Sequence, residues 1–123
     1  MEHIDWQVVV DRSPKGYVEL NNGKHIYYGP VDRVEVIDDN VEIFVQWAAK
    51  KQLDRHGIPV GKWEVTSREP SRLIKIPNNT APFVIESTPE KGDRVRFGMV
   101  NILYFDQVGK LTLEQVQADQ ASA

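Results

Sequence analysis

Cysteine is absent from the 123 residues of this chain. Without thiols there can be no disulfide framework, no thiolate metal site and no cysteine nucleophile. No apolar run approaches the roughly 20 residues that a membrane-spanning helix requires. The opening MEHIDWQVVV also lacks the basic start and the cleavage site of a secretory signal. These absences predict a cytoplasmic protein that does not enter a membrane.

A large excess of charge of one sign is missing as well. The net charge is −3, and the 15 basic and 18 acidic residues are mixed along the chain. A general nucleic-acid binder would carry a clear basic excess, so nucleic acid is not the favoured partner. The hydrophobic fraction of 41% and the chain length predict a single folded domain over residues 1–123 with one core.

Motifs for catalysis and for cofactors are also missing. The three histidines, His3, His25 and His56, are far apart and show no metal-ligand spacing. No G-x-S-x-G nucleophile turn and no glycine-rich phosphate loop is present. We therefore assign no catalytic residue, no metal and no cofactor. A small enzyme with a His/carboxylate site is an alternative, and its acid–base chemistry would be sought at His25, near Tyr27 and Glu19.

What the sequence does contain is alternation of apolar and polar residues, typical of strands with one buried face. Proline and glycine punctuate these segments at a spacing of roughly ten residues, which favours a barrel or a sandwich. The predicted fold is all-β and mainly antiparallel, a small β-barrel or β-sandwich with a short C-terminal α-helix. The predicted strands are 4–10, 17–20, 24–28, a central hairpin from Val31 to Trp47, and then 62–67, 72–76, 83–86 and 95–105.

Two turns predict hairpin registers. Asn22-Gly23 is a strong two-residue turn signal, and it would place Leu20 beside His25. In the central hairpin, an Asp39-Asn40 turn would place Val36 beside Ile43 and keep one face apolar.

The regions around the central hairpin have different patterns. Gly29-Pro30 is expected to end the strand before it, and Trp47 is expected to continue the apolar face of Ile43 and Val45. From Ala48 to Val60 the alternation is lost, which predicts an exposed excursion between strands.

The last part of the chain contains two further signals. The run MVNILYF, from Met99 to Phe105, is apolar on both faces apart from Asn101, as expected of a strand covered on both sides. Thr112 and Gln115 have the spacing of a capping box, which predicts a short helix over residues 112–121.

Aromatic residues give the main functional hypothesis. They form a packed core, or they line a pocket for a small apolar ligand inside the curved sheet. The ligand-binding residues of the second interpretation are Trp47, Trp63, Phe44 and Tyr27.

Basic residues give an alternative. Arg94 and Arg96 are two apart and so share a strand face, and Arg72 and Lys75 lie on another predicted strand. Together they would form a platform for single-stranded nucleic acid. A solvated face balanced by nearby glutamates explains the same residues.

The sequence thus favours a non-catalytic binding or assembly module. Its partner would be a small apolar ligand, or a second copy of the chain paired through a strand edge to form a homodimer. The segment from Lys50 to Pro59 is the predicted contact surface, because no strand pattern accounts for it.

Overall fold

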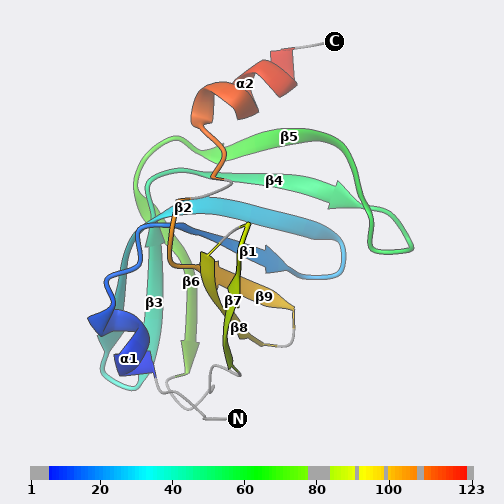
Figure 1. Ribbon diagram of the computed structural model, residues 1–123. Helices are drawn as coiled ribbons and strands as arrows, with labels where there is room; N and C mark the ends of the chain where they lie inside the picture. The colour runs from blue at the N-terminus through cyan, green and yellow to red at the C-terminus, as the bar shows by residue number, and fades with distance from the viewer. Residues whose placement is uncertain (1–5, 78–83, 91, 99, 108–109, 122–123) are drawn as a thin grey trace.

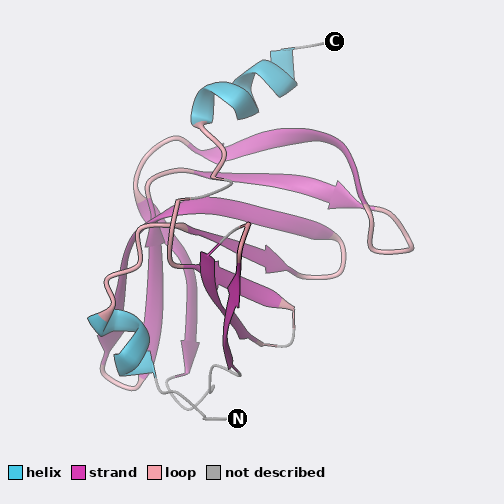
Figure 2. Ribbon diagram, in the orientation of Figure 1, coloured by secondary structure: helices cyan, strands magenta, loops and turns pink. Residues whose placement is uncertain are grey.

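Antiparallel strands dominate the computed structural model, which describes residues 6–77, 84–90, 92–98, 100–107 and 110–121 (Figure 1). A short helix stands at each end of this region (Figure 2). The all-β fold class and the short C-terminal helix are confirmed. The elements are α1 (Trp6–Asp11), β1 (Tyr17–Asn21), β2 (His25–Ile37), β3 (Asn40–Val45), β4 (Ala48–Leu53), β5 (Pro59–Ser67), β6 (Ser71–Pro77), β7 (Val84–Thr88), β8 (Gly92–Phe97), β9 (Asn101–Tyr104) and α2 (Leu113–Ala121).

The strands form one open sheet with two arms that share β2. In the long arm the order is β5-β4-β2-β1-β9-β8-β7, and in the short arm β3 lies between β2 and β6. The first part of β2 pairs with β4 and its second part pairs with β3, with a register shift between Val31 and Arg33. The arms therefore diverge at a bend in β2, and they run in different directions in Figure 1.

The main core lies between the two arms. Val18 and Leu103 from the long arm and Ile43 from the short arm are fully buried there. Helix α1 adds Trp6 and Val9, both 0% exposed. The indole ring of Trp6 meets Phe97 edge-on with ring centroids 5.3 Å apart. This helix therefore covers one side of the core that the sheet leaves open.

A second cluster occupies the opposite face of the long arm, beneath α2. We call it the outer aromatic cluster. Its buried members are Tyr17, Tyr28, Trp47, Ala49, Tyr104 and Val116, with half-buried Trp63, Val65, Ile102, Leu111 and Leu113 around them. Helix α2 contributes Val116, 1% exposed, so its first turns seal this aromatic face.

The predicted N-terminal strand is wrong in its described part, since Trp6–Asp11 is a helix; residues 4 and 5 lie outside the described residues. Trp6 and Val9 are three apart, so one helical face buries both, while Val8 is 41% exposed. In so short a segment, the apolar residues fit both the strand period of two residues and the helical period of 3.6 residues.

Both hairpin registers differ from prediction by two residues. Leu20 pairs with Tyr27 rather than His25, because the side chains of Asn21 and Asn22 accept backbone N–H groups and widen the turn. In the central hairpin the turn is Asp38-Asp39, and Val36 pairs with Val41. Since side chains alternate with a period of two, a shift of two residues leaves every side chain on its predicted face.

The bend explains three further errors. Gly29-Pro30 lies inside β2 rather than ending a strand: a Cβ on Gly29 would lie 2.7 Å from Val45 Cγ1, so the close approach of β2 to the end of β3 requires glycine. Trp47, just past β3, belongs to the outer aromatic cluster and does not continue the inner face of Val45. Ala48–Leu53 is a strand, not an excursion, and Ala48 and Ala49 are buried because small side chains fit where the arms meet.

The predictions for the last part of the chain are confirmed in part. The single strand predicted over 95–105 is wrong: this segment contributes to two antiparallel strands, β8 and β9, with Gly98 just after β8 and Met99 outside the described residues. The predicted cover on both faces holds within β9, with Leu103 in the main core and Tyr104 in the outer aromatic cluster, but not at Val100, which is 54% exposed. The capping box is confirmed: the backbone N–H of Gln115 donates to Thr112 Oγ1 at 3.1 Å, and the backbone N–H of Thr112 donates to Gln115 Oε1 at 2.8 Å.

Candidate functional site

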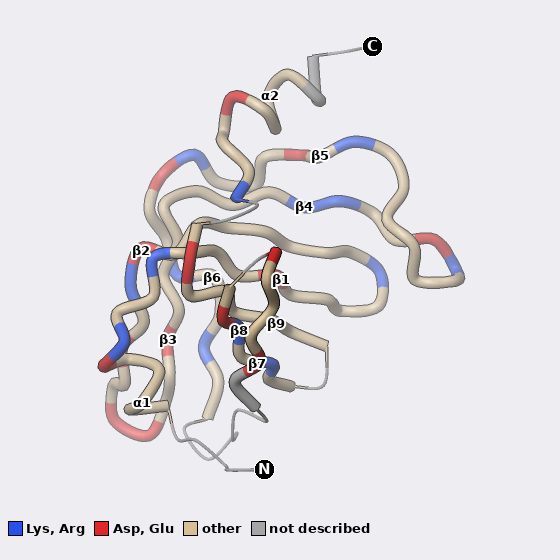
Figure 3. The backbone as a smooth tube through the Cα atoms, viewed as in Figure 1, with Lys and Arg blue, Asp and Glu red and all other residues tan. Residues whose placement is uncertain are grey.

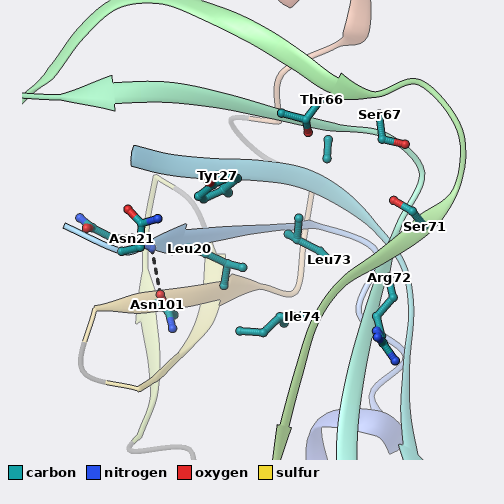
Figure 4. Close-up of a pocket in the computed structure, with 12 residues that line it drawn as sticks. Leu20, Asn21, Tyr27, Thr66, Ser67, Ser71, Arg72, Leu73, Ile74 and Asn101 are labelled. Atoms are coloured by element: carbon teal, nitrogen blue, oxygen red, sulfur yellow. Dashed lines mark hydrogen bonds between the residues drawn. The ribbon is translucent and has the colours of Figure 1, made fainter. Parts of the chain in front are cut away.

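A pocket of about 410 Å³ lies between the two arms (Figure 4). We call it the inner pocket. The end of β1, the strands β2, β4 and β5, and β9 line it from the long arm, and β6 lines it from the short arm. The lining residues are Leu20, Asn21, Asn22, Tyr27, Ala48, Thr66, Ser67, Ser71, Arg72, Leu73, Ile74 and Asn101.

The middle of the inner pocket is apolar. Leu20 and Tyr27, which pair across β1 and β2, face Leu73 and Ile74 of β6 in Figure 4. A β-bulge supplies the β6 side: Arg72 pairs with Phe44 and Ile74 pairs with Ile43, so Leu73 is the extra residue. Bulges redirect side chains, and this one lets two consecutive apolar residues line the same space.

One end of the inner pocket carries asparagine amides. Asn21 ends β1, Asn22 follows it in the turn, and Asn101 begins β9 beside it. The backbone N–H of Asn21 donates to Asn101 Oδ1 at 3.0 Å, which ties β1 to β9 at this point (Figure 4).

The other end carries hydroxyl groups and one cation. Thr66, Ser67 and Ser71 come from the ends of β5 and β6 that meet at the bend. The Ser67 hydroxyl donates to the Glu69 carbonyl at 2.9 Å. Arg72 Nη1 lies 2.6 Å from Oε1 of Glu42, a carboxylate residue that is only 7% exposed.

The four residues predicted to bind a ligand lie in different places. Tyr27 lines the inner pocket, whereas Trp47 and Trp63 pack against Tyr28 in the outer aromatic cluster, with ring centroids 5.6 and 5.9 Å away. Phe44 lies under the guanidinium of Arg33, 3.9 Å from the ring centroid. The structure therefore does not bring these four side chains to one cavity.

The described aromatic side chains of the outer aromatic cluster pack directly against one another. The Tyr17 and Tyr104 rings stack with centroids 4.4 Å apart, and the Tyr28 hydroxyl accepts the Leu111 N–H at 2.7 Å, which holds the chain just before α2. Burial raises the pKa of Tyr17 to about 12 and raises that of Tyr28 as well. These phenols are therefore neutral packing groups.

The basic residues predicted to bind nucleic acid form ion pairs with glutamates or lie apart from one another. Arg94 and Arg96 share a face as predicted, and both bind Glu86, at 2.9 and 3.4 Å. Arg72 binds Glu42, and Lys75 is exposed three residues further along β6. Figure 3 shows basic and acidic residues interspersed along the chain rather than gathered by sign.

The histidines also lie apart. His25 shares a face with Tyr27, their ring centroids 6.2 Å apart, and His56 is exposed at the tip of the β4–β5 hairpin. His3 lies outside the described residues. Among the residues that the structure describes, no group of three His, Asp or Glu side chains could hold a metal ion.

Sequence reasoning missed most of the pocket. From the sequence, Asn22 is interpreted only as a turn former, and the hydroxyl residues carry no motif. The sequence signal that was available is the pair of asparagines next to a glycine turn, where side-chain amides often bond to the backbone.

Comparison of the chain with protein-family models, with curated proteins and with solved structures found no match. Neither described helix is both long and apolar enough to span a membrane. The inner pocket is therefore the structural feature on which the proposed function is based.

Proposed function

We propose that this protein is a non-catalytic binding module that holds a small amphipathic molecule in the inner pocket. The observation that carries the proposal is the pocket itself, about 410 Å³ with an apolar middle and polar ends. Pockets for small ligands commonly have volumes of roughly 300–1,000 Å³, apolar walls and a few polar groups that fix orientation.

The chemistry of the lining favours binding over catalysis. Its polar groups are amides, hydroxyls, a phenol and one guanidinium, and none of the described lining residues carries a carboxylate or an imidazole. General acid–base catalysis depends on groups that titrate near neutral pH. Amides and hydroxyls instead orient a ligand by hydrogen bonds, which supports a binding role.

A fragment screen on the ¹⁵N-labelled protein tests this proposal. We expect amphipathic fragments to shift the amide resonances of Leu73, Ile74 and Asn101. Thr66→Trp should abolish these shifts, because Thr66 lies on the exposed rim and points into the pocket in Figure 4. Lys62→Trp, also at an exposed position of β5 but outside the lining, is the matched control. Fragments that bind elsewhere, or that still bind Thr66→Trp at the same resonances, would refute the proposal.

Self-association stays a second proposal, favoured by exposed apolar residues at the β4–β5 hairpin, where the sequence predicted a contact surface. Ile58 is 57% exposed at the hairpin tip and Val60 is 38% exposed on β5. Within the described part of the chain β5 pairs only with β4, so one edge has no strand partner there. Sedimentation velocity over a range of micromolar concentrations should show a dimer; a monomer throughout would eliminate it.

A further inference from the structure

Two hydroxyl groups face the inner pocket from the ends of β5 and β6. Val65 packs in the outer aromatic cluster, and successive side chains of a strand point to opposite faces, so Thr66 points between the arms, as Figure 4 shows. Ser71 pairs with Val45 of the main core, and partners across two strands share a face of the sheet. Both side chains therefore lie on the inner face.

These two hydroxyls are available to a ligand. Within the part of the chain that the structure describes, neither the Thr66 nor the Ser71 hydroxyl forms a hydrogen bond with another protein group. The Ser67 hydroxyl, by contrast, donates to the Glu69 carbonyl at 2.9 Å. A hydroxyl can both donate and accept a hydrogen bond. Thr66 and Ser71 therefore suit a ligand group that does the same, such as a hydroxyl or an amide.

The charged residue of the described lining does not direct its charge at this site. Arg72 pairs with Phe44, whereas Ile74 pairs with Ile43 of the main core. Because Ile43 and Phe44 are consecutive and point to opposite faces, Arg72 lies on the face opposite to Ile74. Its Nη1 lies there 2.6 Å from Oε1 of Glu42. The cation is therefore turned away from the pocket and neutralised.

The inner face carries a second ion pair beside the pocket. Lys50 pairs with Tyr27 across β4 and β2, so it shares the face of the pocket without belonging to the lining. Its Nζ lies 3.9 Å from Glu64 Oε2. An ion entering the pocket would lose hydration, and no unpaired charge of opposite sign in the described lining would compensate for that loss. The lining therefore favours an uncharged ligand.

We infer that the ligand of the inner pocket is an uncharged molecule with an apolar body and a head group that both donates and accepts hydrogen bonds, a hydroxyl in its simplest form. The head group binds to the hydroxyls of Thr66 and Ser71, and the body lies against Leu20 and Leu73. This inference rests on the proposed function, because it specifies which small molecules the pocket selects.

Three probes with the same body test it: 4-phenylbutan-1-ol, 4-phenylbutanoate and 4-phenylbutylammonium. Each is titrated into the ¹⁵N-labelled protein, and the amide resonances of Leu73 and Ile74 report binding in the pocket. We expect the alcohol to bind at least about tenfold more tightly than either ion, because an ion would leave water without a counter-charge. Equal or tighter binding of either ion would overturn the inference while leaving the pocket's binding role intact.

A double variant tests the position of the head group. Thr66→Val combined with Ser71→Ala removes both hydroxyls and changes the size of the lining little. We expect the affinity for 4-phenylbutan-1-ol to fall about threefold to tenfold, the usual effect of losing neutral hydrogen bonds. Butylbenzene, which has the same ring and chain but no hydroxyl, is the control and should bind the variant at least as tightly as the wild type. Unchanged affinity for the alcohol would refute the inference.

Two single variants complete the test. Thr66→Ser keeps a hydroxyl and should keep the affinity for the alcohol close to that of the wild type. Thr66→Val alone, at an exposed position, replaces the double variant if that protein does not fold. If none of the probes nor any fragment shifts a pocket resonance, the proposed function itself is wrong and the inference fails with it.

Discussion

The two faces of the long arm differ in their aromatic content. On one face, the outer aromatic cluster packs tyrosine and tryptophan rings against each other and seals them under α2. On the other face, the inner pocket is lined by short polar residues and a few aliphatic ones, with Tyr27 as its single described aromatic.

In the outer aromatic cluster, large aromatic side chains fill the space beside the sheet. The inner pocket lies where the lining side chains are smaller. Tyr17, Tyr28 and Trp47 each contact at least one other aromatic ring or α2. Such packing places the described rings in direct contact with one another. Asn, Ser and Thr side chains instead leave a space between the arms, and a bulge in β6 adds apolar surface to it.

The largest expected effect follows from removing an aromatic ring on the filled face. Trp47→Ala should lower the free energy of unfolding by about 3–5 kcal/mol, because the 7% exposed indole would leave a cavity beside Tyr28. Urea denaturation followed by circular dichroism measures the loss. Trp63→Ala, at a half-buried position in the same cluster, is the control and should cost less. Equal costs would mean that burial does not distinguish the two rings.

Much of the fold could be predicted because one-face alternation survives errors of register. Val34, Val36, Ile43 and Val41 share an inner face although the turn lies one residue earlier than predicted. What alternation could not show is the bend. Gly29 and Ala48 have the small side chains that a bend requires, but in sequence they resemble a strand break and a loop.

The candidate site was harder to predict for a related reason. From the sequence, aromatic residues predict the pocket lining, but Trp47 and Trp63 pack beneath α2. The pocket instead combines residues from β1, β6 and β9, and their proximity depends on the angle between the two arms. No local pattern in the sequence specifies that angle.

A smaller and graded effect should appear at alkaline pH. Burial raises the pKa of Tyr17 from 10.0 to about 12, so the folded state retains a phenol proton that the unfolded chain loses. Stability from this source is complete below about pH 10 and declines as the pH rises towards 12. Unfolding in urea at intervals between pH 9 and 12 should show the decline.

The matched variant is Tyr17→Phe, which cannot ionise at this position. In this variant the free energy of unfolding should fall less steeply with pH over the same interval. Tyr28, whose pKa is also raised by burial, keeps part of the slope in that variant. An unchanged profile would mean that the outer aromatic cluster admits water around Tyr17.

The smallest effect is expected on the rim of the inner pocket. Thr66→Ala should change the free energy of unfolding by no more than about 0.5 kcal/mol, as is usual for exposed positions outside packed or bonded features. The same urea assay used for Trp47→Ala measures it. A loss comparable to that of Trp63→Ala would show that the rim supports the two arms. A near-zero change would show that the chain can vary its pocket lining while the opposite face keeps the sheet folded.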